Sequence, residues 1–129
     1  MDIKTLTNFF NYKPFIGQNP QIIVDGIIKT AKEYLPKEQI PMIQKAYEYA
    51  RKAHEGQVRL SREEYIVHPL KATEFLMEIR PDIATIQTCI LHDVIEDTPI
   101  TQEEVEKEFG KEVGNLCEGM VKVSKIKYK

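Results

Sequence analysis

CILHDVIEDT, residues 89–98, places one histidine and three carboxylates within six residues at the end of an apolar run. If the run is helical, His92 and Glu96 lie on one face, four residues apart. Asp93 and Asp97 then form a second column about 100° around the helix axis. Two polar columns on an apolar helix are costly to bury unless a cation meets them. The stretch therefore predicts a site for a divalent metal ion.

The remainder of the chain is a series of helical patterns separated by prolines and glycines. Pro36 and Pro81 are expected to end helices, whereas Asp82 is a good N-terminal cap for the apolar helix that carries the acidic stretch. Thr101 and Glu104 are expected to form a capping box at the start of the next helix. We expect helices over residues 20–35, 38–55, 68–80, 83–97, 102–109 and 111–121. Residues 1–19 are an irregular lead-in, and no segment alternates as a strand does. The predicted fold is an all-α helical bundle in which the helix over residues 83–97 is central.

Composition sets limits on the class of protein. A chain of 129 residues suggests one domain, and a net charge of −2 argues against a general nucleic-acid binder, which needs a strongly basic face. The sequence has no run of eighteen apolar residues and no signal-peptide pattern, so we expect no membrane partner and a cytoplasmic location. Cys89 and Cys117 both fall in apolar helical patterns and are expected to be reduced core residues.

The three histidines of the chain are the candidates for metal binding. His68 opens a predicted helix, His92 stands near the end of another, and His54 points inward near the end of a third. Imidazole nitrogen with carboxylate oxygen suits manganese, iron or zinc. The structural alternatives are that His54 is a hydrogen-bonded core residue, that Glu96 is a solvated surface acid, and that Asp97 only marks a helix exit.

Several motifs in order resemble one known family. From about residue 46 to residue 129 the chain is similar to the N-terminal hydrolase domain of the RelA/SpoT family, HD-superfamily enzymes that remove pyrophosphate from the alarmone ppGpp. The motifs are AHEGQVR (53–59), YIVHPL (65–70), LHDVIEDT (91–98), FG (109–110) and GMVKV (119–123). The resemblance implies an HD-superfamily helical bundle.

The resemblance also implies roles for the acidic stretch and for one histidine outside it. His68, His92 and Asp93 would be ligands of Mn²⁺. Glu96 and Asp97 would be the catalytic acids of hydrolysis. His54 matches a recurrent histidine of the family but is not implied to be a ligand.

A loop before His68 would bind the substrate, a guanine nucleotide (ppGpp or pppGpp). Arg59 would line the nucleotide pocket, where a guanidinium stacks on a base or meets phosphate, and Ser61 would stand beside it. The family has RKSGEPY where this chain has RLSREEY, residues 59–65. Leu60 removes a positive charge, and Arg62 and Glu64 replace a glycine and a proline, which changes the shape of the loop.

The implied activity is ppGpp 3′-pyrophosphohydrolysis in stringent-response metabolism. The family's fourth metal ligand is an aspartate in a later helix, and this sequence ends before that helix and before the family's synthetase domain. Residues 1–129 are therefore expected to form the front, C-terminally truncated portion of an HD hydrolase domain, with exposed apolar faces on the helices over residues 83–97 and 111–121 and a tendency to self-associate. The alternatives are a non-catalytic HD module that binds a nucleotide or a partner, and an HD phosphohydrolase that acts on another nucleotide.

Overall fold

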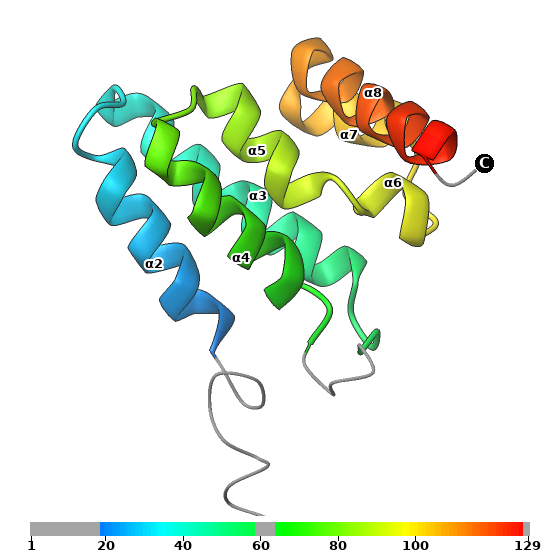
Figure 1. Cartoon of the computed structure of the whole chain (residues 1–129), viewed down its shortest axis with the longest axis horizontal. Helices are drawn as coiled ribbons and strands as arrows, with labels where there is room; N and C mark the ends of the chain where they lie inside the picture. Colours follow the sequence, from blue (N-terminus) through cyan, green and yellow to red (C-terminus); the bar gives the residue numbers. More distant parts are fainter. Residues whose placement is uncertain (1–18, 59–63, 128–129) are drawn as a thin grey trace, which may run out of the picture.

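The structure, a computed structural model, describes residues 19–58 and 64–127, with side chains described as far as Lys122 (Figure 1). Its helical elements are α2 (Pro20–Ala31), η1 (Lys37–Gln39), α3 (Ile40–Ala53), α4 (Val67–Leu76), η2 (Met77–Ile79), α5 (Ile83–Leu91), α6 (Val94–Asp97), α7 (Gln102–Phe109) and α8 (Lys111–Lys127). Over these residues there is no sheet, only an isolated antiparallel bridge between Val58 and Glu64. The predicted all-α class is confirmed.

Helix α5 is the centre of the bundle, as predicted. It contacts α3 and α4 on one side and α8 on the other, and Figure 1 shows it between these elements. Ile86, Ile90 and Leu91 of α5 are fully buried. Each such side chain stabilises the fold by about 1.5–3 kcal/mol relative to an exposed position. The α7–α8 pair therefore shares one core with α2, α3 and α4.

Local capping explains where α5 and α7 begin. The side chain of Asp82 accepts a hydrogen bond from the Thr85 N–H at the start of α5, as predicted. The expected capping box at the start of α7 is also present, because Thr101 and Glu104 each accept from the other's backbone N–H. The first helix is shorter than predicted: α2 ends at Ala31, and the chain continues in turns before Pro36.

The α7–α8 connection is tight. Gly110 between the two helices has φ 99°, a conformation that L side chains rarely adopt. A Cβ built on Gly114 would lie 2.9 Å from the Cβ of Glu106, so the two helices approach each other closely there. Helix α8 begins where the sequence predicts and runs further, to Lys127.

The prediction of one continuous helix over residues 83–97 is wrong. Helix α5 ends at Leu91, and α6 begins at Val94. Asp93, between them, has φ −92° and ψ −5°, in the bridge region of backbone space. Nδ1 of His92 lies 2.6 Å from the Cys89 carbonyl oxygen, so this side chain competes for a carbonyl of the last turn of α5. The two straight columns of polar residues inferred from a regular helix therefore do not form.

Exposed apolar residues are only partly where they were expected. On α8, Leu116 and Met120 are 41% and 45% exposed, in agreement with the prediction, whereas the apolar residues of α5 are buried or half-buried. Phe75 is more exposed, at 77%, and belongs to α4. Self-association through such faces stays a prediction. No helix among the described residues has the length and apolar character needed to cross a membrane.

Candidate metal centre

Three side chains from two helix ends meet at one point. His68 is the second residue of α4, and His92 and Asp93 form the break between α5 and α6. Because α4 contacts α5, the start of one helix is brought to the end of the other. One potential ligand atom from each of the three residues lies within 4.8 Å of the other two. The structure thus brings together the three residues that the resemblance implies as ligands.

The Asp93 carboxylate lies between the two imidazoles. Its Oδ2 atom is 3.3 Å from Nε2 of His92 and 4.0 Å from Nε2 of His68. The side chains of His92 and Asp93 are 17% and 16% exposed, while that of His68 is 44% exposed. The group is therefore anchored in the protein on one side and accessible to solvent on the other.

The tautomer of His92 follows from its hydrogen bond. A carbonyl oxygen only accepts, so the 2.6 Å contact with the Cys89 carbonyl requires a proton on Nδ1 of His92. In the neutral ring, Nε2 then carries the lone pair and faces Asp93. A backbone carbonyl that fixes the ring of a histidine in this way is the usual support of a metal-binding imidazole.

The donor set fits a first-row divalent ion. Two imidazole nitrogens and one carboxylate oxygen are ligands that manganese, iron and zinc accept. Ligand atoms around one such ion are about 3 to 3.6 Å apart, given bond lengths near 2.0–2.2 Å. The 3.3 Å separation of His92 and Asp93 already meets this spacing. A small side-chain rotation of the exposed His68 would complete the group.

Glu96 and Asp97 are both exposed on the short helix α6, directly after the candidate ligands. The Asp97 carboxylate accepts a hydrogen bond of 2.5 Å from the Tyr65 hydroxyl. The backbone carbonyl of Asp97 accepts another, 2.8 Å long, from the side-chain amide of Gln57. Asp97 is therefore more than a helix exit, because its backbone and its side chain are both held.

His54 completes this network from the interior. It is only 2% exposed, its Nδ1 lies 3.2 Å from the Gln57 side-chain oxygen, and its ring stacks on the Tyr65 ring at 4.5 Å. The structural alternative for His54, a hydrogen-bonded core residue, is thus what the structure shows. Its Nε2 is buried and has no hydrogen-bond partner among the described residues.

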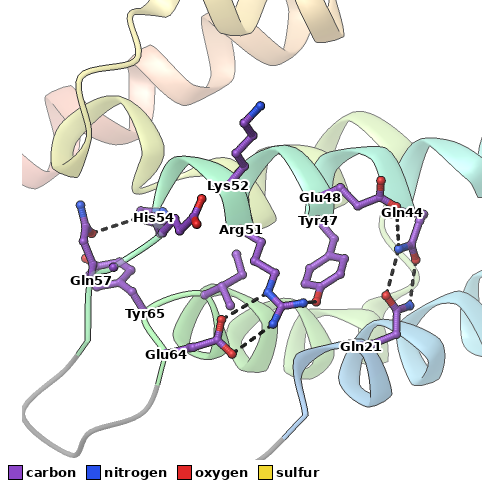
Figure 2. A pocket seen from close by; sticks show the side chains of 13 residues that line it. Gln21, Gln44, Tyr47, Glu48, Arg51, Lys52, His54, Gln57, Glu64 and Tyr65 are labelled. Atoms are coloured by element: carbon purple, nitrogen blue, oxygen red, sulfur yellow. Dashed lines mark hydrogen bonds and ion pairs between the residues drawn. The ribbon is translucent and has the colours of Figure 1, made fainter.

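A cavity of about 480 Å³ lies near this network, between α2, α3 and the residues before α4 (Figure 2). It is lined by His54 and Tyr65 but not by the candidate ligands. Figure 2 shows the Arg51 side chain reaching from α3 to Glu64, with Nε–Oε1 and Nη2–Oε2 distances of 3.2 and 3.4 Å. Glu64, which departs from the family's proline, thus has a structural partner that ties α3 to the segment before α4.

The predicted substrate residues Arg59 and Ser61 lie outside the described residues. So do two of the family departures, Leu60 and Arg62. Gln57 and Tyr65 lie two residues outside the two ends of this segment, and both form a hydrogen bond with Asp97.

Comparison with known proteins identifies the domain. A family model for the HD domain matches residues 46–129. The chain belongs to the HD domain family. This match covers the candidate ligands, the acids of α6 and the His54 network, and the expected resemblance to the RelA/SpoT hydrolase domain is confirmed.

Curated relatives match most of this chain at 42–47% identity. The chain is 42% identical over 107 residues to a guanosine-3′,5′-bis(diphosphate) 3′-pyrophosphohydrolase of Vibrio cholerae and 43% identical over 107 residues to the bifunctional (p)ppGpp synthase/hydrolase SpoT of Escherichia coli. A GTP pyrophosphokinase of Myxococcus xanthus is 47% identical over 97 residues. The first two matches cover 83% of this chain and the third covers 75%, but they take up only 15% and 13% of the relatives' own lengths.

Sequence reasoning missed two polar residues of the site. Gln57 and Tyr65 appear in the motifs that carry the resemblance, but neither was given a role. The available signal was position: Gln57 follows His54 by three residues, and Tyr65 precedes His68 by three. Polar side chains at that distance from a candidate histidine are within reach of the same site.

Proposed function

We propose that this HD domain is a metal-dependent ppGpp 3′-pyrophosphohydrolase. The observation that carries the proposal is the convergence of His68, His92 and Asp93 next to the acids of α6. The names of relatives at 42–48% identity, such as those of Vibrio cholerae and Spiroplasma citri, support ppGpp as the substrate.

We propose Mn²⁺ as the ion and His68, His92 and Asp93 as its protein ligands. When bound, the ion supplies Lewis acidity toward phosphate oxygens and stabilises the negative charge that develops during phosphoryl transfer. His92 is suited to hold it because its Nδ1–H bond to the Cys89 carbonyl turns the lone pair of Nε2 toward Asp93.

The acids of α6 are proposed to handle the water. Asp97, fixed by Tyr65, orients an attacking water molecule, and Glu96 or Asp97 accepts its proton. A bond forms between the water oxygen and the phosphorus of the 3′-pyrophosphate, and the bond between that phosphorus and the ribose 3′-oxygen breaks. The 3′-oxygen takes up a proton, so that ppGpp and water give GDP and pyrophosphate.

The proposed substrate residues are Arg59 and Ser61. Arginine recognises phosphate through a planar fork of donors and stacks on a base, which are the two contacts that a guanine nucleotide offers. The position of both residues between Gln57 and Tyr65 in the sequence supports this assignment, since these two neighbours are bonded to Asp97.

The test is a pyrophosphate-release assay on the purified 129-residue chain with ppGpp and MnCl₂. Release of pyrophosphate and GDP is expected, with loss of release after addition of a chelator and in Asp93→Asn and Glu96→Gln. A matched control is Glu103→Gln, an exposed acid on α7 that is expected to leave turnover unchanged. Absence of turnover with ppGpp, in a chain that is folded and binds Mn²⁺, overturns the proposal.

A second candidate function is a module that binds a nucleotide without turning it over. It is favoured by the relative named GTP pyrophosphokinase, which is 47% identical to this chain over 97 residues but is named for a different activity. Equilibrium binding of ppGpp without release of any product distinguishes this candidate. Turnover of a different nucleotide, in a panel assayed in parallel, would instead indicate an HD phosphohydrolase of another specificity.

A further inference from the structure

Asp97 and three other residues form a closed set of contacts. Nδ1 of His54 faces the Gln57 side-chain oxygen at 3.2 Å, and the Gln57 amide donates to the Asp97 backbone carbonyl at 2.8 Å. The Asp97 carboxylate accepts a hydrogen bond from the Tyr65 hydroxyl, and the Tyr65 ring stacks on the ring of His54. The set starts at a side chain that is 98% buried and ends at an exposed carboxylate, so it links the interior to the candidate site.

We propose that Tyr65 is a positioning residue for Asp97, and that buried His54 holds Tyr65 and Gln57 in the geometry this requires. The inference rests on the proposed function, because it gives Asp97 a task in turnover. None of the roles assigned by resemblance includes Tyr65, Gln57 or His54.

The short helix α6 makes such support necessary. It has only four residues, and Asp97 is its last one, so the helix itself gives little constraint on that side chain. An exposed aspartate samples several rotamers. A hydrogen bond from a phenol to a carboxylate is charge-assisted and short, which makes it about twice as strong as one between neutral groups. The 2.5 Å bond from Tyr65 therefore selects one orientation of the carboxylate.

The chemistry of His54 explains why an imidazole is placed in the interior. The Gln57 amide donates through Nε2 to Asp97, so its oxygen remains to accept from Nδ1–H of His54. This fixes which way the amide of Gln57 faces. The arrangement leaves Nε2 of His54 buried without a partner among the described residues, which costs free energy. An apolar ring would avoid that cost but would not donate to Gln57.

The test is Tyr65→Phe, which removes only the hydroxyl and keeps the ring that stacks on His54. We expect kcat for ppGpp to fall by about 10- to 100-fold, since displacement of a reacting group by about 1 Å has an effect of this size. KM should change less than about twofold, because the substrate contacts are not altered. The matched control is Tyr34→Phe, whose hydroxyl donates to the Pro81 carbonyl at 2.7 Å away from the site, and whose kcat should equal that of the wild type.

A double-mutant cycle distinguishes positioning from a general structural effect. If Tyr65 acts through Asp97, then Tyr65→Phe lowers kcat in the wild type but causes no further loss in an Asp97→Ala background, which has no side-chain acceptor for the hydroxyl. An equal fold-loss in both backgrounds overturns the proposal. A rise in KM with unchanged kcat also overturns it, because Tyr65 would then contact the substrate.

The same cycle, measured by urea unfolding, tests the contact between Tyr65 and Asp97 independently of the proposed enzymatic activity. Should the wild-type chain show no turnover of ppGpp, the proposed function fails but the contact is still measurable. Coupling between Tyr65→Phe and Asp97→Ala that changes the unfolding equilibrium by at least about twofold supports the link. Strictly additive effects of the two substitutions would show that Tyr65 does not hold Asp97.

Discussion

His92 and His54 are held in the same way, through Nδ1, but their Nε2 atoms have different surroundings. Each has its Nδ1 within hydrogen-bond distance of an oxygen, the Cys89 carbonyl for His92 and the Gln57 amide for His54. Nε2 of His92 faces the Asp93 carboxylate at 3.3 Å, whereas Nε2 of His54 is enclosed and unpartnered among the described residues. The group that meets the second nitrogen, rather than the residue type, separates a candidate ligand from an internal support.

The two regions also differ in what surrounds them. The group of His68, His92 and Asp93 lies at helix ends with one face open to solvent. His54 lies where α3 ends, next to the ring of Tyr65, and is 2% exposed. We therefore expect substitutions in the first region to change ligand binding, and substitutions in the second to change stability and the placement of Asp97.

The largest expected effect is on metal affinity. Asp93→Asn or His92→Ala should weaken the binding of Mn²⁺ by more than about 100-fold, because loss of an outer support alone costs 10- to 100-fold. Isothermal titration with MnCl₂ measures this, with Glu103→Gln as a control for loss of an exposed negative charge. If Asp93→Asn kept full affinity for Mn²⁺, the carboxylate that faces Nε2 of His92 would not distinguish this histidine, as a ligand, from His54.

The next effect is on stability, and here the larger change is expected at His54 and the smaller one at the candidate metal ligands. His54→Ala should lower the free energy of unfolding by about 2 kcal/mol, since it leaves a cavity and a Gln57 oxygen without its donor. His68→Ala should cost less than about 0.5 kcal/mol, because that side chain is 44% exposed. Urea unfolding of both variants without metal gives the comparison. A larger loss for His68→Ala would contradict it.

Local signals in the sequence were sufficient for most of the fold. The starts of α5 and α7 were predicted from Asp82 and Thr101, because a cap is made by residues within one turn of each other. The meeting of His68 with His92 was implied only by the resemblance to the RelA/SpoT family, because the two residues belong to the motifs YIVHPL and LHDVIEDT.

The break at His92 and the network around Asp97 could not be predicted in this way. The break involves a side chain that bonds to a carbonyl of its own helix, and an apolar repeat is the same with or without that bond. The network joins Tyr65 to a residue 32 positions later in the chain. Such a pairing depends on how the segment before α4 lies against Asp97, which helical periodicity does not encode.

The two cysteines are expected to differ in reactivity, because Cys117 lies in the interior and Cys89 lies next to the candidate metal centre. Burial raises the pKa of the Cys117 thiol to about 11, while the interaction of the thiol with the Thr88 side chain opposes this shift. Burial also raises the pKa of Cys89, whose carbonyl holds His92, but Cys89 is half-buried and Cys117 is fully buried. We expect iodoacetamide at pH 8 to modify Cys89 at least about tenfold faster than Cys117, as followed by peptide mass spectrometry.

The raised pKa of Cys117 also predicts a pH dependence of stability. The unfolded thiol ionises near pH 9 and the folded one near pH 11, so the stabilising contribution is complete below about pH 9 and is lost as the pH rises toward 11. In Cys117→Ser this part of the alkaline loss should be absent. An unchanged alkaline unfolding curve in that variant would show that the thiol is not protected in the folded state.

The smallest effect is expected at the rim of the cavity beside His54. Glu64→Gln removes the charge that pairs with Arg51, but both side chains are about half exposed, at 47% and 48%. Exposed pairs of this kind contribute about 0.2 to 1 kcal/mol, so the unfolding free energy should fall by less than about 1 kcal/mol. The loss should shrink further in 1 M NaCl, which screens exposed charges. If Glu64→Gln instead lowers kcat as strongly as Tyr65→Phe does, the segment before α4 controls Asp97 as a unit, and the stacking of Tyr65 on His54 is not its main restraint.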